Sequence, residues 1–246
     1  MSSHYIASLT SHPPRFHALP IALDSLAKQI LQPQEVLLNI AHSDAQALPI
    51  EVTSRIARGE VRLNLCDDLG PAKKLIPAIS EFPTTPIIVV DDDLVLEPDL
   101  TLKIMVQHAL YPNSIIASRS HRITVDSDGN INPYDQWSKQ WAIDNGPSAD
   151  IFATAGAGTL FPPHAMHADS LDENLYKELC FYTDDIWWYF HARRVGTNVR
   201  RVLGNRGLEF IDETQDEGLW RTGNKTRNDE NFEKMQNRYG NPLSFY

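Results

Sequence analysis

The stretch from residue 87 to residue 98, Ile-Ile-Val-Val-Asp-Asp-Asp-Leu-Val-Leu-Glu-Pro, runs four apolar residues directly into three acids. A short continuous apolar run is typical of a strand that is buried on both faces, as in a parallel sheet. The carboxylates of Asp91, Asp92 and Asp93 then lie at the carboxyl end of that strand, where open α/β sheets bind their ligands. A simpler interpretation is an acidic turn that closes the strand, because acids are common in turns.

The three adjacent carboxylates repel one another, so the cluster requires a counter-charge. A hard divalent cation is the expected one, because such cations take carboxylate oxygens as ligands. Alternate side chains of a strand share a face, so we expect Asp91 and Asp93 to point into one site and Asp92 to point away from it. The residues therefore indicate a divalent-cation site.

Composition limits the class of protein. The 246 residues are enough for one large domain or two small ones, and the net charge of −10 disfavours general nucleic-acid binding. The two cysteines, Cys66 and Cys180, have neither metal-site spacing nor a disulfide framework, so a reducing cytoplasm is the expected location. No signal peptide is visible, and no apolar run approaches the ~20 residues that cross a bilayer. Peripheral membrane association stays open.

The first 120 residues alternate between apolar runs and helical periods, which predicts a mostly parallel α/β sheet. We expect strands at residues 5–9, 34–40, 61–65, 87–90 and 114–118. We expect helices at residues 19–30, 50–58, 71–82 and 99–108.

The pattern changes after residue 120. A strong hairpin turn lies at 126–130, the apolar run 151–161 is broken by Gly156 and Gly158, and a helix at 184–195 precedes a last strand at 199–202. From residue 211 onward the chain is polar and turn-rich and has little to bury. We therefore expect one domain over 1–210 followed by a polar tail or lid over 211–246.

The order of these features resembles the GT-A glycosyltransferases, in particular the family-two group of nucleotide-sugar enzymes. The resemblance covers roughly residues 4–203, and four stretches carry it: the 87–98 segment with Asp99, Ala7-Ser-Leu-Thr-Ser11 with Arg15, Leu23-Asp-Ser-Leu-Ala-Lys-Gln29, and Asp184-Asp185-Ile-Trp-Trp188 followed by Arg194 and Gly196. It implies a GT-A fold, which is Rossmann-like, with helices on both faces of the sheet and a mixed C-terminal half. Residues 1–120 would form the nucleotide-binding half and 121–210 the acceptor half.

The resemblance also implies a metal cofactor. In such enzymes the acid cluster holds Mn²⁺ or Mg²⁺ against the donor diphosphate, whose growing negative charge the cation stabilises as a Lewis acid. Asp93 would be the metal ligand, Asp91 would contact the metal shell or the ribose, and Asp92 would belong to the donor site.

Two loops are expected to hold the nucleotide. Thr10, Ser11 and Arg15 follow the first strand, where a guanidinium suits a phosphate or a base edge. In the loop that opens the 71–82 helix, Asp67 or Asp68 could accept from the base or ribose, and Lys73 or Lys74 could reach the diphosphate. The simpler interpretations are a solvated arginine, and a capped helix with two solvated lysines.

The acids Asp184 and Asp185 begin a predicted helix, where capping alone could explain them. The resemblance places the general base of an inverting transfer on this pair, and Asp185 is the preferred member. Trp137 or Trp188 could stack on a sugar ring or belong to the core. The small residues at 154–159 allow either close approach of a ligand or a bulged strand.

The leading hypothesis is a metal-dependent glycosyltransferase that uses a nucleoside-diphosphate sugar, with a UDP-sugar as the expected donor and a saccharide or lipid-linked acceptor. No histidine follows His191 to complete a metal site, so Asp212, Glu213 or water would do so. A basic tail segment with Trp220, Arg221, Lys225 and Arg227 could close over the diphosphate.

Two alternatives remain. Asp91-Asp-Asp93-Leu-Val also fits the nucleophile motif of haloacid-dehalogenase-like phosphatases, although those place it on their first strand and here it follows about the fourth. A non-catalytic module that binds a nucleotide-sugar or a metal would use the same loops.

Overall fold

The strand β4 (Ile87–Val90) is the apolar run that precedes the acids, and all four of its residues are buried. Ile87 and Val89 pack into the core on one face of the sheet, and Ile88 and Val90 pack into the core on the other face. A strand that is apolar at every position must be covered on both sides, because successive side chains alternate between faces. The computed structural model, which describes residues 4–144, 146–204, 207–214 and 225–245, confirms the predicted strand.

A seven-stranded sheet forms the centre of the molecule, in the order β10-β6-β9-β4-β1-β2-β3. Strands β4, β1, β2 and β3 run parallel, as do β10 and β6, whereas β9 is antiparallel to both β4 and β6. The bounds of the other strands are β1 Ile6–Thr10, β2 Glu35–Ala41, β3 Arg62–Cys66, β6 Ile115–Ala117, β9 Ala157–Phe161 and β10 Val199–Arg201. This is the mostly parallel sheet with a mixed C-terminal half that the sequence predicts.

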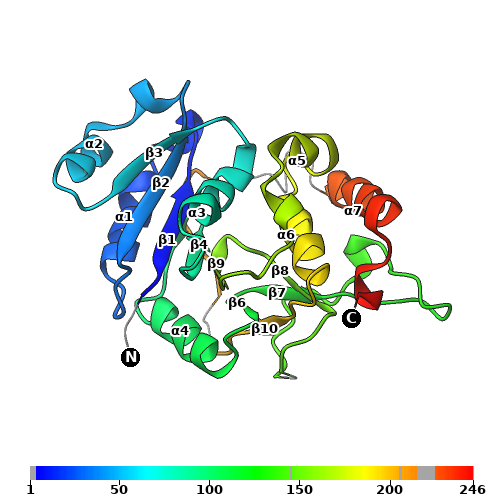
Figure 1. Cartoon of the computed structure of the whole chain (residues 1–246). Coiled ribbons are helices and arrows are strands. Elements are labelled where there is room, and N and C mark those ends of the chain that lie inside the picture. Colours follow the sequence, from blue (N-terminus) through cyan, green and yellow to red (C-terminus); the bar gives the residue numbers. More distant parts are fainter. Residues whose placement is uncertain (1–3, 145, 205–206, 215–224, 246) are drawn as a thin grey trace.

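Helices cover both faces of the sheet. One core contains residues of α1 (Leu19–Ala27), α2 (Ile50–Ala57) and α4 (Leu100–Leu110). The opposite core contains residues of α3 (Ile76–Glu81), α5 (Glu173–Leu179) and α6 (Asp184–Arg193). In Figure 1, β1 and β4 lie between α1 on one side and α3 on the other. The three-layer arrangement confirms the predicted α/β class.

Two short strand pairs flank the central sheet. The residues after the acids form β5 (Leu94–Val95), which pairs with β11 (Glu209–Phe210). The apolar run at 151–161 is not one strand, because β8 (Ile151–Ala153) pairs with β7 (Ser120–Arg122) and only β9 joins the central sheet. The register of β9 against β4 shifts at Gly158, whose φ of +98° suits glycine.

The helix predicted over 71–82 is broken. A 3₁₀ turn, η3 (Gly70–Lys74), precedes α3, and the break falls at Leu75. Pro77 explains it, because proline has no N–H to bond the carbonyl four residues earlier. The hydroxyl of Ser8 donates to the carbonyl of Lys74 at 2.6 Å, so the break also anchors η3 to β1.

The prediction that the chain after residue 211 has little to bury is wrong. Helix α7 (Lys225–Tyr239) buries Phe232 and Met235, and the Phe232 ring meets the rings of Trp137 and Phe190 at centroid distances of 5.4 and 4.9 Å. The two apolar residues are sparse in a polar helix, so periodicity gives little signal. Arg227 lies over the ring of Tyr182, whereas Trp220, Arg221 and the side chain of Lys225 lie outside the described residues.

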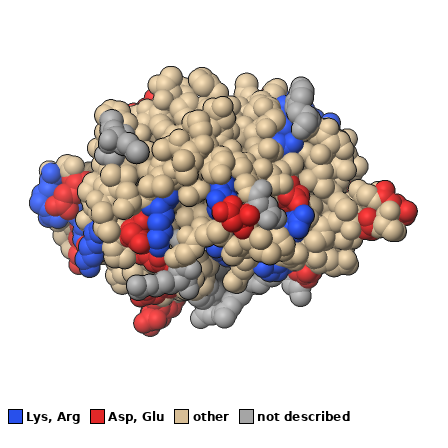
Figure 2. Space-filling model, turned by 90° about the horizontal axis from the view of Figure 1, so that it is seen from below, with Lys and Arg blue, Asp and Glu red and all other residues tan. Residues whose placement is uncertain are grey.

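The surface and the helices show two further features. The face in Figure 2 carries acidic and basic residues side by side rather than in one patch of a single sign. None of the helices in the described part of the chain has both the length and the apolar character needed to cross a bilayer.

The packing of α7 can be tested with Met235→Ala. We expect it to lower the free energy of unfolding by about 2 kcal/mol or more, because the fully buried side chain leaves a cavity. Glu233→Ala, on the exposed face of the same helix, should change it by less than about 0.5 kcal/mol. Equal urea midpoints for the two variants would contradict the packing of this helix on the core.

Candidate functional site

The carboxylates of Asp92 and Asp93 share one guanidinium. Arg15, which follows β1, donates from Nη1 to Asp92 and from Nη2 to Asp93, both at 2.9 Å. The hydroxyl of Ser11 donates to the second oxygen of Asp92 at 2.5 Å. The prediction that Asp92 points away from the site is therefore wrong, because the chain leaves strand geometry after Val90 and the alternation ends there. Arg15 is largely buried and is not a solvated loop arginine.

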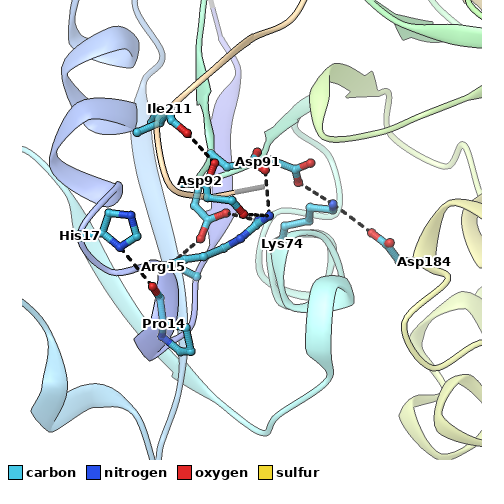
Figure 3. A network of polar contacts seen from close by, with 11 residues as sticks. Pro14, Arg15, His17, Lys74, Asp91, Asp92, Asp184 and Ile211 are labelled. Atoms are coloured by element: carbon cyan, nitrogen blue, oxygen red, sulfur yellow. Dashed lines mark hydrogen bonds and ion pairs between the residues drawn. The ribbon is translucent and has the colours of Figure 1, made fainter. Parts of the chain in front are cut away.

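Lys74 lies between two carboxylates that come from different elements (Figure 3). Its ammonium is 2.8 Å from Asp91 at the end of β4 and 3.1 Å from Asp184 at the start of α6. The side chains of Lys74 and Asp184 are buried, whereas that of Asp91 is 37% exposed. Burial alone would lower the pKa of Lys74, but Asp184 and Asp91 outweigh it and raise that pKa. The solvated-lysine interpretation is thus excluded.

Other residues predicted to bind the nucleotide contact groups outside the acid cluster. The hydroxyl of Thr10 donates to the Asn39 carbonyl at 2.8 Å. Lys73 is buried and donates to Asp68 at 2.6 Å, and Asp68 also accepts from the N–H of Gly70. Asp67 is exposed beside them. Thr10 ends β1, and Asp67 and Asp68 follow β3, as predicted, whereas Lys73 lies in η3. The contacts described for these residues do not reach the acid cluster.

The two acids of α6 differ in their surroundings. Asp184 contacts Lys74 and accepts from the indole N–H of Trp188 at 3.4 Å, whereas Asp185 accepts from the backbone N–H of Ala155 at 2.8 Å. Burial, with the charge of Asp184 beside it, raises the pKa of Asp185 to about 7. Trp188 is in the core, and so is Trp137, so the core interpretation of both tryptophans is correct. Asp185 is therefore a carboxyl that changes protonation near neutral pH.

The site carries more negative than positive charge. The acids at 91–93, 184 and 185 contribute five carboxylates, against the two cations Arg15 and Lys74 that contact them. Burial and the charge of Asp91 raise the pKa of Asp93 to about 6, and burial raises that of Asp92. This excess fits a divalent cation. Within the described residues, however, no three acidic, histidine or cysteine side chains are arranged as metal ligands. Arg15 contacts one oxygen of Asp93, and Lys74 contacts one oxygen of Asp91.

Gly156 permits a close approach of the chain to itself. Its carbonyl accepts from the N–H of Asp91 at 2.7 Å, and a Cβ at this position would lie 1.6 Å from a carboxylate oxygen of Asp91. Among the small residues at 154–159, Gly156 thus allows Asp91 to pack closely, and Gly158 allows the register shift between β9 and β4.

The segment 211–214, which was expected to begin a tail or lid, borders the acid cluster. The N–H of Ile211 donates to the Asp93 carbonyl at 2.8 Å, and Arg15 donates to the Thr214 carbonyl at 3.4 Å. Asp212 and Glu213 lie between these contacts with exposed side chains.

Two residues near the site were missed by sequence reasoning. Arg119 follows β6 and donates to the hydroxyl of Thr154 at 2.9 Å, and its charge contributes to the pKa of Asp91. Arg201 ends the neighbouring strand β10. The sequence did contain a signal for both, because Arg119 and Arg201 each lie at the carboxyl end of a predicted strand.

One cavity lies away from these acids, none of which lines it. Its volume is about 390 Å³, and it lies between α1 and the β5–β11 pair, where Ser25, Val95 and Leu208 are among its lining residues. A second cavity, of about 10 Å³, lies beside Asp185 and Trp188. The candidate site is therefore identified by its charges and by its place on the sheet.

The sequence matches no known family model and no curated protein. Solved structures do share the fold. The 4-diphosphocytidyl-2C-methyl-D-erythritol synthase from Anaerococcus prevotii has a TM-score of 0.54 and 16% identity over 87% of this chain and 92% of that chain. A second 4-diphosphocytidyl-2C-methyl-D-erythritol synthase has a TM-score of 0.50 and 13% identity over 90% of this chain and 99% of that chain.

A third similar structure is residues 1–349 of S. aureus TarS, with a TM-score of 0.53 and 12% identity over 96% of this chain and 71% of that chain. At these identities the likeness concerns the fold alone. The chain has the GT-A-like, Rossmann-like α/β fold that the sequence predicts.

The approach of Gly156 to Asp91 can be tested with Gly156→Ala. We expect a loss of about 1–3 kcal/mol in the free energy of unfolding, because the added methyl group displaces the Asp91 carboxylate. In the double variant with Asp91→Ala the loss should be clearly smaller than the sum of the single losses. Strictly additive values in urea unfolding would contradict the close contact.

Proposed function

We propose that this protein is a glycosyltransferase that moves a sugar from a nucleoside-diphosphate donor, a UDP-sugar, to a saccharide or lipid-linked acceptor with inversion. The observation that carries the proposal is the contact of Lys74 with both Asp91, which follows β4, and Asp184, at the start of α6, at the carboxyl edge of the sheet. The fold supports it, since the similar structures include a synthase named for a diphosphocytidyl compound and TarS, a glycosyltransferase.

Asp91 and Asp93 would hold a Mn²⁺ or Mg²⁺ ion. The excess of carboxylates over cations supports this assignment, and so does the partial exposure of Asp91. When bound, the ion supplies Lewis-acid stabilisation to a leaving diphosphate. Arg15 and Lys74 already lie against the same acids, so they can supply further positive charge to an anion placed there.

The donor nucleotide would lie over the carboxyl ends of β1 and β3. Arg15, which is paired with Asp92, lies near the carboxyl end of β1. Asp67 and Asp68 are exposed after β3, where they can accept hydrogen bonds from a base or ribose. Thr10 and Lys73 would act by holding these loops through Asn39 and Asp68.

Asp185 would act as the general base. Its carboxylate takes the proton of the acceptor hydroxyl while that oxygen bonds to the anomeric carbon and the bond to the diphosphate breaks. The Ala155 N–H orients the carboxylate, and Asp184 places α6 through its contact with Lys74. The acids at 91–93 follow the fourth strand of the chain rather than the first, which disfavours the phosphatase alternative.

The donor can be identified by thermal shift with UDP-, GDP-, CMP- and dTDP-sugars, each with and without Mn²⁺. We expect the melting temperature to rise most with a UDP-sugar plus Mn²⁺, because ligand binding stabilises the native state by mass action. A donor-hydrolysis assay with the same ligand separates an enzyme from a binding module. Failure of every nucleotide sugar to shift the melting temperature would contradict the proposal.

The role of Asp93 can be tested with Asp93→Ala. We expect it to abolish Mn²⁺-dependent donor turnover and to weaken Mn²⁺ binding in calorimetry, because a carboxylate ligand is lost. Asp128→Ala, in the exposed hairpin turn, makes the same change away from the site and should leave both unchanged. Unchanged turnover in Asp93→Ala would refute the assigned role.

The role of Asp185 predicts a pH dependence. Since its pKa is raised to about 7, the base form is present above that pH, and kcat should fall as the pH drops through 7. Asp185→Asn should lower kcat by about 10²–10⁴-fold and remove this limb of the pH profile. A variant that keeps the limb near pH 7 would show that another group is the base.

A further inference from the structure

Two arginines lie at the carboxyl ends of neighbouring strands on the far side of the acid cluster from Arg15. Arg201 is the last residue of β10 and pairs with Ala117 of β6, two residues before Arg119. Strands β4 and β6 are both antiparallel to β9, so they run in the same direction and their carboxyl ends share one edge of the sheet. Arg119 and Arg201 are therefore at the same edge as Asp91.

These arginines have no anionic partner in the parts of the chain that the structure describes. The guanidinium of Arg119 donates from Nη1 to the Thr154 hydroxyl, and its Nε is buried without a partner. The Nε and Nη1 atoms of Arg201 are also buried without partners. Arg15 and Arg193 each direct several of their donors to acceptors, carboxylates for Arg15 and carbonyl and amide oxygens for Arg193, although the Nε of Arg15 is also buried without a partner. Buried donors that remain unpaired cost free energy, so each one requires an explanation, such as a role in binding a ligand.

The two arginines repel each other and disfavour positive charge on their neighbours. Burial and the nearby charge of Arg119 lower the pKa of Arg201 to about 10. Burial lowers the pKa of His121 to about 3, and both arginines contribute to that shift. An anion bound at this place would offset the repulsion between the two guanidiniums.

The contacts of Arg119 place this charge beside the proposed general base. Arg119 donates to the side chain of Thr154, and the next residue, Ala155, donates its N–H to Asp185. The two cations assigned to the donor, Arg15 and Lys74, come instead from the β1 side of β4. An anion held by the arginines would thus lie on the acceptor side of the reacting atoms.

We propose that Arg119 and Arg201 form a subsite for a phosphate group carried by the acceptor, an assignment that rests on the proposed transferase function. Two guanidiniums match the charge of a phosphate, about −1.5 to −2, better than the single charge of a carboxylate. The planar guanidinium also presents paired donors to phosphate oxygens. The acceptor would then be a phosphorylated saccharide or a lipid-linked phosphate, bound by its phosphate while its hydroxyl faces Asp185.

The test uses inorganic phosphate as a probe and the melting temperature as the readout, on the full-length protein saturated with UDP and Mn²⁺ and on the protein without them. We expect phosphate to raise the melting temperature in both cases, and acetate to do so much less. Arg201→Met should weaken phosphate binding at least tenfold, and Arg201→Lys should restore part of it. Arg58→Met is the matched control, because Arg58 is exposed and pairs with Glu60 far from the site.

Two outcomes would overturn the assignment. If phosphate raised the melting temperature equally in the wild type and in Arg201→Met, the two arginines would not form a phosphate subsite. If the effect of phosphate on the melting temperature disappeared once UDP and Mn²⁺ were bound, the arginines would bind the donor diphosphate instead.

A third outcome separates this inference from the proposed function. A protein that fails to bind any nucleotide sugar, yet keeps phosphate binding that depends on Arg201, would contradict the proposed function and support the anion subsite.

Discussion

The contact of one buried ammonium with two carboxylates holds the candidate site together. Lys74 brings Asp91, at the end of β4, to Asp184, at the start of α6. A charge buried away from water is tolerated only where opposite charges are close, and removal of Lys74 would leave the buried Asp184 carboxylate without this cation. The position of Lys74 depends in turn on the break before α3 and on the Ser8 hydrogen bond to its carbonyl. The geometry of the acids is thus set by the sheet.

The sequence predicts the fold well because its signals are local. The apolar run before Asp91 and the alternation of strands and helices depend only on neighbouring residues, and the structure reproduces them to within a few residues. The failures are long-range. The burial of Phe232 depends on partners near residues 137 and 190, and the unpaired charge on Arg119 becomes visible only when β10 lies beside β6. The sequence analysis named the acids and the cations Arg15 and Lys74, but it did not predict the ion pairs between them.

The antiparallel strand β9 organises charge along the sheet edge. It lies between β4 and β6, and the turn that precedes it provides the Gly156 carbonyl for Asp91, the Ala155 N–H for Asp185 and the Thr154 hydroxyl for Arg119. Backbone and small side chains can approach charged groups closely, so this turn needs residues without bulk. Three consecutive small residues, 154–156, therefore contact the acid cluster, the proposed base and one of the two arginines in turn.

Two neighbouring carboxyls on α6 can have different tasks because of helical geometry. Successive residues of a helix point about 100° apart, so the side chains of Asp184 and Asp185 meet different hydrogen-bond partners. Asp184 forms an ion pair with Lys74, whereas Asp185 accepts a hydrogen bond from the N–H of Ala155 in the turn before β9. Burial and the charge of Asp184 raise the pKa of Asp185 to about 7. The acid that anchors the helix thus also makes its neighbour a stronger base. The ion-paired carboxylate of Asp184 and the neighbouring carboxyl of Asp185, with its raised pKa, are therefore parts of one electrostatic arrangement.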